Sequence, residues 1–185
     1  MQTNETIHQL KLQLWNLSYS RYISQEILSI QWWGLALSLL AIYLVWWKLV
    51  DKSRLIELLL FGSFVTVIAT VIDLFGYNSG HWDYNIRLLP IFPATFPFDF
   101  TLVPILLMLA LQYTFTWPSY LVGSAFSSAI FSYIIIPLFA ATGIKTYYNW
   151  KYSYFFALMM GVAIASRIAL FTIMKIARKN NYNIH

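Results

Sequence analysis

The chain has 185 residues, of which 59% are hydrophobic and only 10% are charged. Soluble proteins carry roughly 25% charged residues, so this composition excludes an ordinary soluble domain and favours a lipid bilayer as the solvent. The absence of cysteine excludes disulfides, cysteine-ligated zinc, iron–sulfur clusters and thiolate catalysis. The formal net charge of +5 comes from lysines and arginines that lie mostly beside apolar segments, which indicates membrane topology rather than nucleic-acid binding.

The N-terminal segment, residues 1–29, lacks the charged start, apolar core and cleavage site of a signal peptide, so we expect it to be retained. Its residues Ile7, Leu10, Leu14 and Leu17 recur at helical spacing. This pattern predicts an amphipathic helix lying in the membrane interface. The alternative is a partly ordered polar tail.

The apolar runs that follow are continuous rather than alternating, which predicts an all-α integral membrane bundle of about five transmembrane helices. Short connections between successive spans favour antiparallel neighbours in an up-down arrangement. The domain covers residues 30–175, and a basic tail, 176–185, follows it. The predicted spans are residues 30–47, 55–77, 98–116, 120–141 and 153–175.

The connection between the second and third predicted helices, residues 78–97, contains three prolines that prevent a regular helix. Orientation is predicted from the basic residues nearest the span ends. The dense clusters KLVDKSR and KIARK place the C-terminus in the cytoplasm, and the Pro-rich loop then faces outward. Arg167, inside the fifth span, is expected to reach the headgroups or to pair with Glu57.

Small residues on the last two predicted spans indicate where helices approach closely, because lipid provides no hydrophobic drive for helix association. We expect the two spans to pack against each other through these stripes. The alternative is that the stripes bind a second copy of the chain or another membrane protein. The stripes are Gly123, Ser124, Ser127, Ser128 and Ser132 on the fourth span, and Ala157, Gly161 and Ala165 on the fifth.

Five ionisable residues gather on the predicted outer side: Asp73, His81, Asp83, Arg87 and Asp99. Charged groups at membrane depth are costly and are often functional. If the loop folds back, Asp73 and Asp99 approach each other, share a proton and act as an acid and a base. Alternatively, Asp99 caps its helix and Arg87 pairs with Asp83 or Asp99. Asp73, His81, Asp83 and Asp99 are of types that can bind a metal ion, but their spacing matches no standard pattern. We therefore predict neither a metal nor a cofactor.

One stretch of the chain, HWDYNIRLLPIFPATFPFDFTLVPILLMLALQYTFTW, carries an unusual set of motifs: W-x-Y, L-L-P, P-F-D-F and P-x-x-x-M-L-x-x-Q-Y. It resembles a functionally uncharacterised family of small multi-pass membrane proteins of spore-forming Gram-positive bacteria. The resemblance implies a bacterial plasma-membrane location and no particular reaction. The matching positions are Trp82, Tyr84, Leu88 to Pro90, Pro97 to Phe100, Pro104, Met108, Leu109, Gln112 and Tyr113, continuing through Trp117, Pro137, Gly143 and Asn149 to Lys151.

Two classes of function fit this sequence. The leading hypothesis is a non-enzymatic interaction or structural component, whose outer loop and interfacial helix contact a partner or lipid. The alternative is a membrane enzyme that acts on an isoprenoid or lipid through Asp73 and Asp99, with Trp82, Tyr84 and Phe98 lining an apolar pocket. A fainter likeness to carotenoid-cyclase-type domains points the same way, although only Asp99 stands where that pattern has paired acids. A buried pair of close acids beside a cavity favours the enzyme.

Overall fold

The computed structural model describes residues 2–91 and 97–181. In these ranges the fold is an all-α bundle with a single two-stranded ribbon. The helices and strands, in chain order, are α1 Gln2–Arg21, α2 Ile30–Leu49, α3 Leu55–Asn78, β1 Trp82–Tyr84, α4 Val103–Gln112, α5 Trp117–Ile130, α6 Ile136–Ala141, β2 Lys145–Tyr147 and α7 Tyr152–Asn181. Three π-helical turns, Tyr22–Glu26, Phe98–Leu102 and Phe131–Ile135, interrupt or extend them.

Four helical segments of the described chain are long and apolar enough to cross a membrane. They cover Ile30–Leu49, Lys52–Asn78, Trp117–Ala141 and Tyr152–Ala177, and large apolar side chains such as Ile56, Val122 and Phe126 point outward from them. Such a surface requires lipid around it, because water would have to solvate a continuous apolar belt. The sequence prediction of an all-α membrane bundle is therefore confirmed.

The third predicted span, residues 98–116, is shorter than expected, because its helix ends at Gln112. Thr116 instead caps α5, accepting a bond from the Ser119 backbone N–H in a capping box. The helical segment Phe98–Gln112 measures about 22 Å at 1.5 Å per residue. It is buried along most of its length against α3 and α5, so its ends meet protein rather than lipid.

The small-residue stripes lie differently from the prediction. Helices α5 and α7 do pack together, and the Tyr120 hydroxyl donates to the Ala163 carbonyl at 2.8 Å. On α7, however, the predicted stripe of Ala157, Gly161 and Ala165 is exposed, because larger residues such as Met159 turn inward. That stripe faces the lipid, so any role of it in binding a partner stays a prediction.

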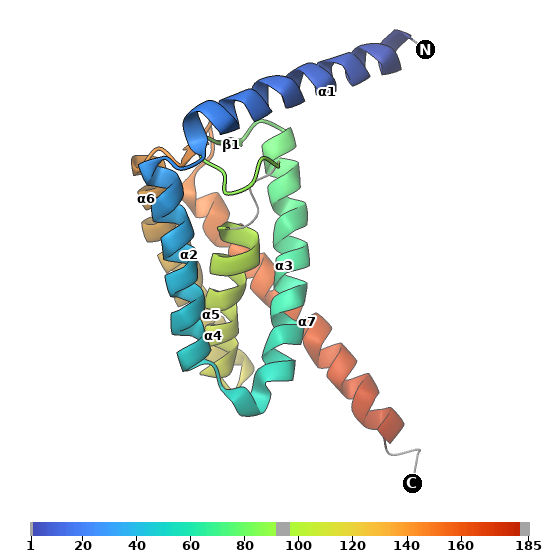
Figure 1. Ribbon diagram of the computed structural model, residues 1–185. Helices are drawn as coiled ribbons and strands as arrows, with labels where there is room; N and C mark the ends of the chain where they lie inside the picture. The colour runs from blue at the N-terminus through green and yellow to red at the C-terminus, as the bar shows by residue number, and fades with distance from the viewer. Residues whose placement is uncertain (1, 92–96, 182–185) are drawn as a thin grey trace.

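The two ends of the bundle differ in character (Figure 1). At one end, the ribbon end, β1 and β2 pair antiparallel and α1 lies across the bundle. At the other end, the basic end, are the start of α3 and the C-terminal part of α7. There the Gln112 side chain accepts from the Asp51 backbone N–H at 2.8 Å and donates to the Leu49 carbonyl at 2.9 Å, which fixes the α2–α3 turn on α4.

A fully buried ion pair attaches the N-terminal segment to the loop after β1. The Arg87 guanidinium donates to both oxygens of Glu26, at 2.8 and 2.5 Å, and each side chain is only 1% exposed. Ser18 accepts two further bonds from the same guanidinium, through its hydroxyl and its carbonyl. Arg87 therefore pairs with Glu26 rather than with Asp83 or Asp99, and α1 is fixed at its C-terminal end.

Replacing Glu26 by glutamine should destabilise the protein by about 3–5 kcal/mol, because it leaves the Arg87 charge buried and unpaired. The matched control is Glu57→Gln, which weakens the partly exposed pair between Glu57 and Arg54 and should cost less than about 1 kcal/mol. Thermal unfolding of both variants in lipid nanodiscs measures the difference. Equal losses in the two variants would contradict a structural role of the buried pair.

Candidate functional site

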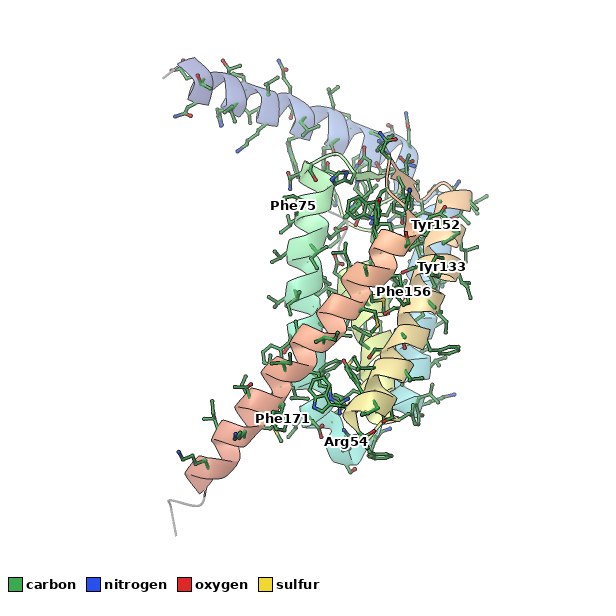
Figure 2. The ribbon with its side chains drawn as sticks, turned by 180° about the vertical axis from the view of Figure 1, so that it is seen from behind. Arg54, Phe75, Tyr133, Tyr152, Phe156 and Phe171 are labelled. Atoms are coloured by element: carbon green, nitrogen blue, oxygen red, sulfur yellow. The ribbon has the colours of Figure 1, made fainter. Side chains whose placement is uncertain are left out.

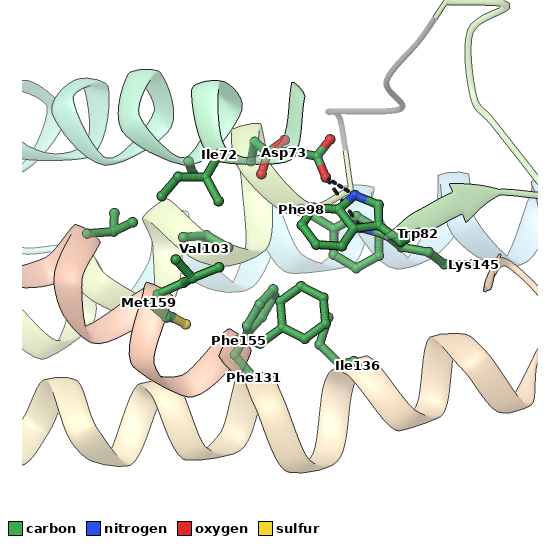
Figure 3. Close-up of a pocket in the computed structure, with 14 residues that line it drawn as sticks. Ile72, Asp73, Trp82, Phe98, Val103, Phe131, Ile136, Lys145, Phe155 and Met159 are labelled. Carbon is green, nitrogen blue, oxygen red and sulfur yellow. Dashed lines mark hydrogen bonds and ion pairs between the residues drawn. The ribbon is translucent and has the colours of Figure 1, made fainter. Parts of the chain in front are cut away.

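Asp73 lies near the end of α3, where its carboxylate accepts hydrogen bonds from two other segments (Figure 3). The same oxygen, Oδ1, accepts from the Trp82 indole at 2.9 Å, the Tyr84 hydroxyl at 2.5 Å and the Lys145 ammonium at 3.4 Å. Trp82 and Tyr84 come from β1, and Lys145 comes from β2. The Asp73 side chain is buried and has little access to water, so these hydrogen bonds take the place of its hydration.

The local sequence explains how the ribbon reaches Asp73. Alternate residues of a strand point to one face, so Trp82 and Tyr84 turn together toward the bundle. In the ribbon, Tyr84 stands opposite Lys145. Gly76, three residues after Asp73, makes room for the Trp82 ring, because an added Cβ atom would lie 1.9 Å from it. Any larger residue at position 76 would displace the indole from the carboxylate.

Lys145 is 3% exposed, and its ammonium is enclosed by aromatic rings. The Nζ atom lies 4.3 Å from the centre of the Tyr84 ring, 4.5 Å from Phe98 and 5.0 Å from Trp82, and it donates to the Tyr84 hydroxyl at 2.9 Å. Burial lowers the pKa of Lys145, whereas Asp73 and Asp99 oppose that shift. The ring faces and the carboxyl groups thus stabilise the charge that burial disfavours.

Tyr84 connects the ammonium to the carboxylate, since its hydroxyl accepts from Lys145 and donates to Asp73. Burial, and then the nearby Asp73 and Asp99, raise the pKa of Tyr84 well above its usual value. The phenol therefore keeps its proton and remains a hydrogen-bond donor at any physiological pH. Burial likewise raises the pKa of Tyr147, whose ring lies 5.5 Å from the Lys145 Nζ atom.

Asp99 lies in the π-helical turn that precedes α4, and it is buried. It makes no capping bond there. Its carboxyl group instead interacts with that of Asp73, and both residues line the same cavity. No described group donates to the Oδ2 atom of Asp73 or of Asp99. Asp73, Asp99 and Lys145, which we call the Asp–Lys cluster, thus bring two acids and a single ammonium together.

The Asp–Lys cluster borders a cavity of about 50 Å³ inside the bundle. That volume has room for about three to five water molecules. Its other walls are mainly apolar and come from α3, α4, α6, α7 and the two π-helical turns that begin at Phe98 and Phe131. Figure 3 shows Ile72, Phe131 and Met159 among them. The cluster therefore has a polar side facing the ribbon and a free side facing an apolar space.

The remaining residues that the sequence singled out lie apart from the Asp–Lys cluster. His81 contacts Trp150, with ring centres 4.6 Å apart, and the Asp83 carboxylate accepts from the Tyr84 backbone N–H at 2.7 Å. Arg87 is engaged by Glu26. Among the described residues no group of three or more histidine, cysteine or acidic side chains could hold a metal ion.

Sequence reasoning did not select Lys145. Two signals point to it in retrospect: both outer loops of an up-down bundle lie on the same side, and KTY repeats the alternation of WDY. Together they would have suggested that the two loops pair and bring a lysine to the acids.

Comparison of the chain with protein-family models, characterised proteins and solved structures gives no match.

Lys145→Met should destabilise the protein by about 3–5 kcal/mol, because it leaves two buried acids without a cation. Adding Asp73→Asn to that variant should restore part of the loss, since the second change removes the uncompensated charge. Thermal unfolding in nanodiscs gives both values. Lys151→Met, which removes an exposed lysine shortly after β2, is the control and should change stability by less than about 0.5 kcal/mol. Additive losses in the double variant would show that the two groups are not coupled.

Proposed function

We propose that this chain is a non-enzymatic component of the bacterial cell membrane that binds a proton between Asp73 and Asp99. The observation that carries the proposal is the mismatch of charge in the Asp–Lys cluster, where one buried ammonium is accompanied by two buried carboxyl groups at the edge of a cavity. Burying an uncompensated charge is costly. A single proton shared by the two acids makes the cluster neutral.

Proton occupancy should affect how the ribbon sits on the bundle. Trp82, Tyr84 and Lys145 attach β1 and β2 to α3 through the Asp73 carboxylate. When the shared proton leaves, the second acid competes with Asp73 for the Lys145 ammonium, so the bonds that hold the ribbon are redistributed. The ribbon and α1 lie at the same end, which is the surface through which a membrane partner or lipid would sense the change.

The family resemblance agrees with this assignment. The W-x-Y motif supplies Trp82 and Tyr84, the P-F-D-F motif supplies Phe98 and Asp99, and all four residues surround Asp73 and Lys145. Motifs from separate segments that meet in one buried cluster are best explained by a shared role. We therefore propose membership of that family, a plasma-membrane location and a cytoplasmic basic end.

A second candidate is an enzyme that acts on an isoprenoid or lipid, with Asp73 and Asp99 as acid and base. It is favoured by the apolar walls of the cavity and by the two carboxyl oxygens that accept no bond from the described residues. Two features weigh against it. The aromatic faces that would stabilise a substrate cation already surround Lys145, and the cavity of about 50 Å³ is far below the ~300 Å³ of ordinary ligand pockets.

Infrared spectroscopy of the protein in nanodiscs tests the shared proton directly. At neutral pH the wild-type protein should show the carbonyl band of a protonated carboxylic acid, and Asp99→Asn should abolish it, because the remaining acid then pairs with Lys145. Asp83→Asn, which removes a carboxylate from β1 outside the cluster, should leave the band unchanged.

Absence of the band in the wild-type protein, or its persistence in Asp99→Asn, would refute the proton site. The enzyme is tested separately by comparing membrane lipids of cells that express the wild-type protein or Asp99→Asn. A lipid that accumulates only with the variant would favour the enzyme.

A further inference from the structure

A second cavity, of about 550 Å³, lies at the basic end between α3, the α4–α5 turn and α7. Figure 2 shows Arg54 and Phe171 at this end, where α7 passes obliquely across the bundle. Leu111, Phe115 and Phe171 contribute apolar walls, and Arg54, Arg167 and Lys175 contribute positive charge. We call this space the basic groove. It is at the opposite end of the bundle from the ribbon.

The charge in the basic groove is unbalanced. Glu57, which also lines the groove, accepts two bonds from Arg54, at 3.1 and 2.9 Å, so that these two charges compensate each other. No carboxylate among the described residues forms an ion pair with Arg167 or Lys175. The groove therefore keeps two cations that no acid of the described chain neutralises.

Arg167 is also held in position, and it does not pair with Glu57 as the sequence suggested. Its guanidinium donates to the Thr116 carbonyl at 3.3 Å and lies over the rings of Trp117 and Tyr120, 4.5 and 4.2 Å from their centres. A guanidinium carries five N–H donors in a rigid fork that matches the oxygens of a phosphate. Stacking thus fixes a donor set whose other members are available to an anion.

Amphiphiles suit such a groove better than soluble anions do. Its walls of leucine and phenylalanine belong to helices that run in the bilayer, so an acyl chain is the natural filling of the space between them. Basic residues at a membrane surface attract anionic lipids. We propose that the basic groove binds one anionic phospholipid, its phosphate at Arg167 and Lys175 and an acyl chain along Leu111 and Phe171.

The test titrates phosphatidylglycerol into the purified full-length chain in a non-ionic detergent and counts bound lipid by native mass spectrometry. The wild-type protein should bind phosphatidylglycerol more tightly than phosphatidylcholine. Arg167→Gln and Lys175→Gln should each weaken phosphatidylglycerol binding roughly fivefold, the effect of one cation near an anionic lipid. Lys179→Gln removes an equal charge one turn further along α7, outside the groove, and should leave the affinity unchanged.

Equal binding of the two lipids, or equal weakening by Lys179→Gln, would overturn the proposal in favour of general surface attraction. A competition experiment with glycerol 3-phosphate tests the soluble alternative. If glycerol 3-phosphate displaces phosphatidylglycerol at a concentration similar to that of the lipid, the groove is a site for a soluble phosphate and the proposal is wrong. Lys175 is exposed, so its variant decides the question even if Arg167→Gln does not fold. The outcome is independent of the proton site, which lies at the ribbon end.

Discussion

The need to satisfy the buried carboxylate of Asp73 determines the structure of the ribbon end. A carboxylate near the end of an apolar helix must find partners within the protein, because lipid offers none. Trp82, Tyr84 and Lys145 supply them, and they come from two loops that are more than 50 residues apart in sequence. Satisfying one buried charge thus pulls both loops onto the bundle, pairs them as strands and closes the cavity beneath them. The short ribbon follows from the charge rather than from strand propensity.

The same physics fixes the N-terminal segment. In lipid, apolar contacts give helices little reason to associate, so polar bonds and close packing determine which segments meet. Arg87 and Glu26 form a second buried pair that holds α1 on the loop after β1. The π-helical turns coincide with these sites: Glu26 and Asp99 each lie in one, and Phe131 of the third lines the cavity. An extra residue in a helical turn reorients its side chains, which is how such turns often serve functional sites.

The sequence predicts those features of this structure that depend on neighbouring residues, and it does not predict contacts between distant segments. The continuous apolar runs predict the four long membrane helices within a few residues, because the composition of each span depends on its own surroundings. The proximity of Asp73 and Asp99 also follows from their places at the same end of adjacent spans. Lys145 and Glu26 were missed, since each partner lies about 60 residues or more from the group it pairs with. The prediction that Ala157, Gly161 and Ala165 face the neighbouring helix was wrong, because small residues also occur on a lipid-facing surface.

The two ends of the molecule differ in the sign of the charge that the protein itself leaves uncompensated. At the ribbon end, each buried cation has an acid, and the one excess acid can be satisfied by a proton, the only cation small enough for a hydrogen bond between two carboxyl groups. At the basic end the excess is positive, and it lines a groove large enough for a chain and a headgroup. The two proposals follow from this difference in size and charge: a small site with surplus negative charge suits a proton, and a larger apolar groove with surplus positive charge suits an anionic lipid. Helices α3 and α7 border both cavities, so the same two helices connect the site of surplus negative charge to the site of surplus positive charge.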